Sequence, residues 1–178
     1  WLDEKKTTPY EMYQYFINTA DADVIKYIKY YTFLSREEIE ELEKKVLTEP
    51  HLREAQKVLS KEIVTMVHGA KAYEQAVHIS EVLFSGKVKE LNAEEIEEGF
   101  KGVPTSEINK PTNIVDCLVE IKAASSKREA RTFLENGAIS INGEIIKDMN
   151  FVISSEGAIE NRFTIVRRGK KNYYLIRH

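Results

Sequence analysis

The sequence is poor in metal-binding and disulfide-forming residues, with one cysteine, Cys117, and four histidines in 178 residues. A single cysteine cannot form an internal disulfide, and the scattered histidines offer no spacing that is typical of a zinc site. These absences fit a reducing compartment, so we expect a cytoplasmic location and no bound metal. Cys117 lies between apolar residues in NIVDCLVEI, which favours a buried small side chain over a reactive thiol.

Long apolar runs are absent as well. No segment approaches the roughly 18 consecutive apolar residues that a membrane-spanning helix requires, and the composition, 42% hydrophobic and 31% charged, is that of a globular protein. We therefore expect no interaction with a membrane. The chain begins at Trp1 with neither an initiator methionine nor a signal-peptide pattern, so we expect it to be part of a longer protein.

Acidic residues are missing from one part of the chain, and this matters more than the net charge of −3. The segment 162–178, RFTIVRRGKKNYYLIRH, contains six basic residues and no acidic ones. Residues 113–178 have 11 Lys and Arg against 8 Asp and Glu, a net charge of +3, whereas residues 1–112 have 15 against 21, a net charge of −6. Since a polyanion responds to the local field, this distribution predicts that the C-terminal third binds a polyanion.

Capping signals and apolar stripes predict that residues 1–102 form an all-α domain. In the capping box, the side chain of a Ser, Thr or Asn accepts a hydrogen bond from the backbone N–H of the residue three positions on. That residue is a glutamate, whose carboxylate accepts from the backbone N–H of the capping residue. The pattern begins at three places: Thr8, Ser35 and Asn92. Apolar residues recur at helical spacing after the first two starts and in the segments 52–67 and 70–84. Gly86 is placed to end the last of these in a left-handed conformation.

The segment 103–112 is predicted to link two domains. It places two prolines among polar residues and shows little apolar periodicity, which is typical of a linker. Residues 113–178 are then expected to form a small domain of short helices and an antiparallel sheet, to which the C-terminus adds two strands, 162–168 and 172–177. The predicted fold class is α+β.

The most informative segment is SSKREARTFLENGAISINGEII, residues 125–146. A helix is predicted to begin after Ser126, with Glu129 completing a capping box, and to end at Gly137. Asn142-Gly143 is a favoured two-residue turn, so the alternating residues around it predict a β-hairpin. The order is therefore helix, glycine stop, strand, turn and strand.

Basic residues on this helix and on the terminal hairpin predict contacts with phosphate. Arg128 and Arg131 lie three residues apart, so both guanidinium groups share one face near the positive end of the helix. The turn between the last two strands adds four more cations: Arg167, Arg168, Lys170 and Lys171. We predict that these six residues bind RNA phosphates, with an affinity that falls steeply with salt and with more recognition of shape than of base identity.

The segment resembles the αL RNA-binding motif named after the small-subunit ribosomal protein S-four. The matched positions are Ser126, Arg128, Glu129, Ala130, Arg131, Gly137, Asn142 and Gly143. Thr132 departs from the motif, because many members of that family carry an arginine there. The resemblance gives Glu129 a place in the motif, so we do not interpret it as catalytic.

The preceding part resembles the anticodon-binding helical domain of bacterial tyrosyl-tRNA synthetases. The resemblance is carried by the opening WLDEKKTTPYEMYQYFINTADADVIKYIKYYTFLSREEIEELE and by HGAKAYEQAVHISEVLFSG. It implies the C-terminal tRNA-binding part of a class I ligase that joins tyrosine to tRNA with ATP. The HIGH-type and KMSKS-type signatures of the catalytic domain do not occur in this sequence.

The same resemblance implies that the partner is tyrosine tRNA and that this part of the protein needs no cofactor. The helical domain would receive the anticodon region, and the αL domain would grip the anticodon stem and the long variable arm. The parent would be a homodimer through its catalytic domain, whereas a chain without that domain could be monomeric.

Two questions stay open at the level of the sequence. Asp21 and Asp23, beside the loop between the first two helices, are candidates for contact with an anticodon base edge, with helix capping as the competing explanation. The alternative function is a stand-alone αL-type RNA-binding module associated with the ribosome or with stress. An enzyme within these residues is not indicated, because there is no nucleophile–base pair, phosphate-binding glycine loop or metal spacing.

Overall fold

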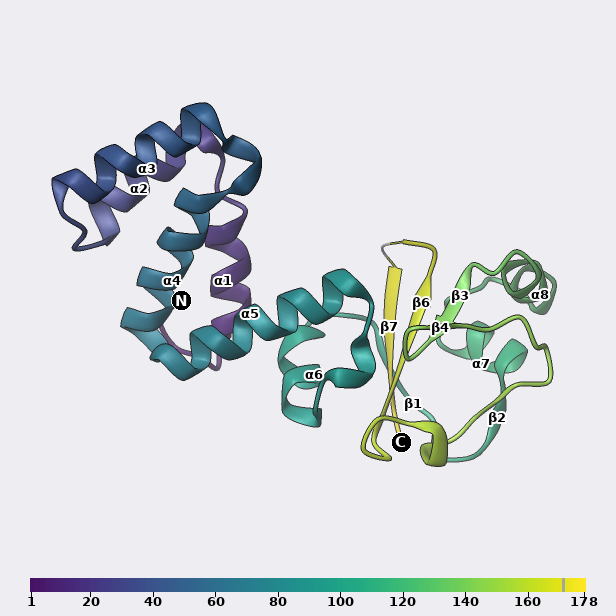
Figure 1. Ribbon diagram of the computed structural model, residues 1–178. Helices are drawn as coiled ribbons and strands as arrows, with labels where there is room; N and C mark the ends of the chain where they lie inside the picture. Colours follow the sequence, from purple (N-terminus) through teal and green to yellow (C-terminus); the bar gives the residue numbers. More distant parts are fainter. Residues whose placement is uncertain (171) are drawn as a thin grey trace. The chain divides into compact units, whose positions relative to one another are not determined.

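The computed structural model describes residues 1–170 and 172–178, which divide into two compact units, Trp1–Glu81 and Val82–His178 (Figure 1). Each unit has its own buried apolar core. The first unit is helical and the second combines helices with a sheet, so the predicted α+β class is confirmed. In the part of the chain that is described, no helix is long and apolar enough to cross a membrane.

The first unit is built from consecutive helices. They are α1 (Pro9–Ile17), α2 (Asp21–Tyr31), α3 (Arg36–Thr48), the short 3-10 turn η1 (Pro50–Leu52), α4 (Glu54–His68) and most of α5 (Ala70–Ser85). The capping boxes at Thr8 and Ser35 are confirmed, since each backbone N–H donates to the glutamate three residues on at 2.7 Å. These local bonds fix where α1 and α3 begin.

Helix α4 packs against α1, α2 and α3 and so organises the core of the first unit. Val24 and Ile28 of α2 and Leu59 and Val64 of α4 are completely buried there. The apolar stripes were predicted correctly in most positions. Leu47, near the end of α3, is an exception, because its side chain is exposed.

The second unit contains the remaining elements. They are η2 (Val88–Glu90), α6 (Ala93–Gly99), β1 (Thr105–Glu107), β2 (Thr112–Asn113), α7 (Ile114–Glu120), α8 (Lys127–Glu135), β3 (Ile139–Ile141), β4 (Glu144–Ile145), β5 (Val152–Ile153), η3 (Ser155–Gly157), β6 (Phe163–Arg168) and β7 (Asn172–Arg177). Five strands form one sheet in the order β1-β7-β6-β3-β4, and β2 pairs with β5 separately. Strand β1 runs parallel to β7, and the other pairs are antiparallel.

Side chains alternate between the two faces of the five-stranded sheet. Val166 of β6 and Ile176 of β7 point into the core that α7 and α8 complete. The opposite face carries Tyr173, whose ring lies 5.7 Å from that of Phe100, the residue that follows α6. Helices α7 and α8 thus cover one face of the sheet and α6 covers the other (Figure 1).

The chain divides at a different point from the predicted one, which placed a helical domain at 1–102 and a linker at 103–112. Residues from Val82 onward belong to the second unit, where Glu97 of α6 pairs with Arg177 of β7 at 3.1 Å. Within the expected linker, Ile108 is 3% exposed and its N–H donates to the carbonyl of Arg177 at 2.9 Å. Because Glu97 and Arg177 are 80 residues apart, no local sequence pattern could reveal this association.

Candidate nucleic-acid interface

Helix α8 presents the two arginines that the sequence selected. The hydroxyl of Ser126 caps the helix by accepting from the N–H of Glu129 at 3.2 Å. Ala130 and Leu134 form its buried side, so Arg128 and Arg131 lie on the exposed side. Neither guanidinium forms an ion pair with any described residue. The positive charge on this face is therefore not neutralised within the described part of the protein.

The second half of the predicted capping box on α8 is wrong. The carboxylate of Glu129 does not return to the backbone of Ser126 but accepts from both the N–H and the hydroxyl of Ser125, each at 2.6 Å. These hydrogen bonds to Ser125, helped by the positive charge of Arg168, hold the pKa of Glu129 below its usual value. Glu129 thus orders the segment that leads into α8.

Arg168 is half-buried and its guanidinium is engaged inside the second unit. Its Nη1 donates to the carbonyl of Ala123, in the loop between α7 and α8, at 2.7 Å. The guanidinium carbon lies 5.5 Å from the centre of the Phe133 ring and 6.0 Å from that of Tyr174. The sequence predicted a phosphate ligand at this position, whereas the structure gives the side chain three internal partners.

The other predicted residues of the terminal hairpin differ in exposure. Arg167 is half-buried on the opposite face of the sheet, where its Nη1 lies 3.8 Å from the position that a Cβ on Gly86 would take. Lys170 is exposed in the turn and forms no ion pair with a described residue. Lys171 lies outside the described residues. Of the predicted phosphate ligands that the structure describes, Arg128, Arg131 and Lys170 are thus exposed and free of internal ion pairs.

Lys147 is an exposed cation that was not among the predicted phosphate ligands. Its Cε and Nζ lie 3.2 and 3.9 Å from the position that a Cβ on Gly137 would take, so the side chain runs along the end of α8. The carbonyl of Ala138 accepts from the N–H of Gly169 at 2.8 Å, which brings the hairpin turn and Lys170 to that same end. Only the position of Lys147 shortly after the predicted hairpin could have indicated it.

Asp21 and Asp23 both lie in the first turn of α2 and are exposed. Neither caps the helix, because Ala20 holds the cap position and makes no side-chain bond there. The carboxylate of Asp21 accepts from the side chain of Gln56 at 2.6 Å, and Gln56 is 1% exposed. Arg53 donates to the carbonyl groups of Ile17, at the end of α1, and of Thr19, in the loop that follows it. The loop before α2 is therefore held in place, with Asp23 presented to solvent.

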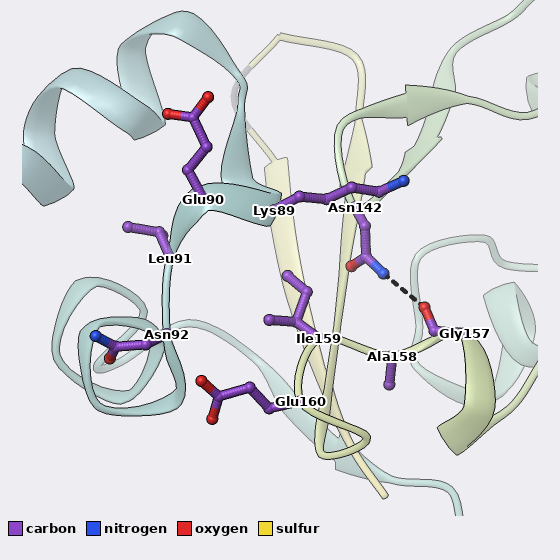
Figure 2. A pocket seen from close by; sticks show the side chains of 9 residues that line it. All are labelled: Lys89, Glu90, Leu91, Asn92, Asn142, Gly157, Ala158, Ile159 and Glu160. Carbon is purple, nitrogen blue, oxygen red and sulfur yellow. Dashed lines mark hydrogen bonds between the residues drawn. The ribbon is translucent and has the colours of Figure 1, made fainter.

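A cavity of about 460 Å³ lies in a different part of the second unit, lined by residues 89–92 and 157–160 together with Asn142 (Figure 2). Two carboxylates line it, Glu90 and Glu160, against one ammonium group, Lys89, which pairs with Glu144. The excess of negative charge opposes a phosphate ligand. None of the exposed cations along α8 lines this cavity.

Two family models match successive parts of the chain. Residues 1–85 match the tRNA synthetases class I (W and Y), and residues 95–176 match the tyrosine–tRNA ligase SYY-like C-terminal domain. Each of the two compact units is therefore covered by a model from the same group of enzymes. This does not fit the alternative of a stand-alone αL module.

Individual relatives agree with the family models. The chain is 55% identical to the tyrosine–tRNA ligase of Staphylococcus carnosus, over 100% of this chain and 43% of that protein. It is 52% identical to tyrosine–tRNA ligase 1 of Bacillus subtilis, over 99% of this chain and 42% of that protein. It thus spans less than half the length of these curated relatives.

A solved structure can be compared as well. A solution structure of a tyrosyl-tRNA synthetase C-terminal domain is 46% identical, with 53% of this chain and 96% of that chain covered and a TM-score of 0.45. The two family models and the identity of 55% and 52% to curated tyrosine–tRNA ligases, over 100% and 99% of this chain, indicate the same family. The chain belongs to the tyrosine–tRNA ligase family and includes its C-terminal domain.

Proposed function

We propose that this chain is the tRNA-binding part of a tyrosine–tRNA ligase and that its partner is tyrosine tRNA. The observation that carries the proposal is the surface along α8, where Arg128 and Arg131 are exposed and have no ion-pair partner among the described residues, and where Lys147 and Lys170 flank the other end of the helix. We call these four residues the α8 cation surface. The family membership of both units supports the same conclusion.

The α8 cation surface has the chemistry and the size to hold an RNA backbone. Guanidinium groups donate to phosphate oxygens in a planar fork, and ammonium groups add compact point charges. Helix α8 has nine residues and is therefore roughly 13 Å long at the rise of an α-helix. Cations at both ends of the helix can contact more than one phosphate at once, so binding releases several counterions.

The first unit is proposed to read the anticodon region through Asp21 and Asp23. An ionised carboxylate only accepts hydrogen bonds, so it favours a base edge that donates. Asp21 is held by Gln56, and Asp23 is exposed beside it. A fixed position of this kind is what discrimination between base edges requires.

We assign the ligase reaction, which joins tyrosine to tRNA with ATP, to the part of the family's proteins that lies outside this chain. No residue of this chain is given a catalytic role or a cofactor. We further propose a cytoplasmic location and a homodimer whose interface lies in the part of the protein outside this chain.

Binding of the whole chain to tyrosine tRNA tests the proposal, with a tRNA that has a short variable arm as the comparison over a series of salt concentrations. We expect tighter binding to tyrosine tRNA and an affinity for it that falls steeply with salt. Equal affinity for the two tRNAs would contradict the proposed choice of partner. An affinity that does not change with salt would contradict the phosphate contacts.

A further inference from the structure

One guanidinium, that of Arg168, connects the elements that carry the α8 cation surface. From the end of β6 it donates to the carbonyl of Ala123 in the α7–α8 loop at 2.7 Å. It also lies against the rings of Phe133 on α8 and Tyr174 on β7. Strands β6 and β7 lead directly into the turn with Lys170, and α8 carries Arg128 and Arg131. Arg168 therefore contacts both α8 and the terminal hairpin, the two elements that carry Arg128, Arg131 and Lys170.

The loop that Arg168 holds has an ordered but disfavoured backbone. Lys122 has φ +59°, a left-handed conformation that residues with a Cβ seldom adopt. The N–H of Ala124 donates to the carbonyl of Leu118 at 2.9 Å, and Ser125 is bound twice by Glu129. The hydrogen bond from Arg168 to Ala123 lies in the middle of this segment. Without it, the loop loses a hydrogen bond that joins it to β6.

Much of the guanidinium group of Arg168 is already engaged within the second unit. Its field acts on the carboxylate of Glu129 at the start of α8, and the carbonyl and the two rings occupy further parts of the guanidinium. These partners reduce what Arg168 can offer to a phosphate. A guanidinium can stack on rings and donate to a carbonyl at the same time, which an ammonium group cannot do in the same geometry.

We propose that Arg168 is a positioning residue, which fixes α8 with Arg128 and Arg131 relative to the hairpin turn with Lys170 and acts through the carbonyl of Ala123. The inference rests on the proposed function, because the elements that Arg168 aligns are the proposed phosphate ligands. Holding them at a set separation before RNA arrives removes an ordering cost from binding. Arg168 contributes to affinity in this way without being counted among the phosphate contacts.

The test uses Arg168→Gln and Arg168→Lys in the whole chain, with two measurements. The first is the affinity for tyrosine tRNA over a salt series, and the second is amide hydrogen exchange of residues 122–127 without RNA. Both variants are expected to bind about tenfold more weakly, which is the effect of roughly one lost ordering contact. The salt slope, which is the dependence of log affinity on log salt concentration, should stay unchanged, and amide exchange in the loop should become faster. The lysine variant is expected to fail to rescue binding although it keeps the charge.

A direct phosphate contact would give a different pattern. Arg168→Gln would then make the salt slope shallower by about one contact, Arg168→Lys would restore most of the affinity, and loop exchange would stay unchanged. Any of these results would overturn the inference. If Arg168→Gln does not fold, Phe133→Leu removes one stacking partner alone, and it is expected to speed exchange at 122–127 and weaken binding at constant slope. Unchanged exchange and binding in Phe133→Leu would also overturn the inference.

Arg128→Gln serves as the matched comparison that separates this inference from the proposed function. It is expected to make the salt slope shallower and to leave exchange of the loop unchanged. If Arg128→Gln and Arg131→Gln leave both affinity and slope intact, the proposed RNA surface fails. If they behave as expected while Arg168→Gln also changes the slope, only the positioning role fails.

Discussion

Asn142 and Ile165 exchange two hydrogen bonds at the turn of the motif hairpin. The N–H of Asn142 donates to the carbonyl of Ile165 at 2.8 Å, and the N–H of Ile165 donates to the side-chain oxygen of Asn142, also at 2.8 Å. The amide nitrogen of Asn142 reaches the carbonyl of Gly157 at 3.2 Å. At φ +48° and 5% exposure, this residue needs a short side chain that both donates and accepts. The asparagine of the αL motif therefore has a structural role here.

Asn142→Ala is expected to lower the free energy of unfolding by about 2–4 kcal/mol, because it removes two hydrogen bonds and leaves the buried N–H of Ile165 without a partner. Chemical denaturation of the variant measures the loss. Asn150→Ala is the control, because Asn150 is exposed, and it should change stability by less than about 0.5 kcal/mol. Equal stability of the two variants would show that the side chain of Asn142 is not needed.

Three glycines of the second unit differ in whether an alanine there would strain the backbone, overlap with neighbouring atoms, or do neither. A Cβ on Gly143, at φ +87°, would lie 2.5 Å from the carbonyl oxygen of Gly86, whereas one on Gly169, at φ +64°, would meet nothing within 4 Å. Gly157 has open space and no positive φ. Substitution by alanine should therefore leave stability nearly unchanged at Gly157, cost about 1 kcal/mol at Gly169, and cost at least about 3 kcal/mol at Gly143. Thermal or chemical denaturation of the three variants gives the order, and a Gly143→Ala variant as stable as Gly169→Ala would contradict the close approach.

The parts of the fold that depend on neighbouring residues were predictable from the sequence. Thr8, Ser35 and Asn92 cap helices with the glutamates expected of them, because the bonds join residues three apart. At α8 the same rule failed for Glu129, since Ser125, one residue before the cap, offers two donors instead of one. A pattern that considers only the cap position cannot show this competition.

The parts that depend on distant residues could not be predicted. The approach of α6 to the sheet rests on Phe100 with Tyr173 and on Glu97 with Arg177, none of which has a local signature. The candidate surface likewise depends on contacts between residues far apart in the sequence. The sequence placed Arg167 and Arg168 side by side as ligands, but the alternation of a strand sends them to opposite faces, and only the folded loop supplies Ala123 as a partner for Arg168.

Lys147→Gln is expected to weaken binding of tyrosine tRNA and to make the dependence of log affinity on log salt shallower by about one contact. The reason is that Lys147 is exposed beside the end of α8 and forms no ion pair with a residue that the structure describes. Lys127→Gln is the matched control, because Lys127 is on α8 itself but its ammonium group lies 2.6 Å from Asp116. A slope that changes equally in both variants, or in neither, would exclude Lys147 from the surface.

Glu129 should make the stability of the second unit sensitive to acid. Its pKa is lowered in the folded protein by the hydrogen bonds from Ser125, so its contribution is fully present above the ordinary value of 4.5 and is lost as pH falls through the lowered one. The free energy of unfolding should therefore fall more steeply below pH 4.5 in the unmodified protein than in Glu129→Gln. Parallel pH profiles of the two proteins would contradict the role assigned to Ser125.

Cys117 is completely buried in the core of the second unit, and burial, with a smaller effect of Glu120, raises the pKa of its thiol to about 12. Since the thiolate is the reactive form, iodoacetamide at pH 8 should leave the native protein unmodified and should alkylate it fully in denaturant. Mass spectrometry measures the extent. Rapid alkylation of the folded chain would show that this core opens readily.

The central claim is that RNA binds along α8, and a charge-matched pair of double variants tests it most directly. Arg128→Gln with Arg131→Gln removes two charges from α8, and Arg36→Gln with Lys57→Gln removes two from α3 and α4, where each is paired with a glutamate. The dissociation constant for tyrosine tRNA, measured over a salt series, should rise strongly in the first protein with a slope shallower by about two contacts, and should change little in the second. Equal effects in the two proteins, or an unchanged slope in the first, would contradict the account.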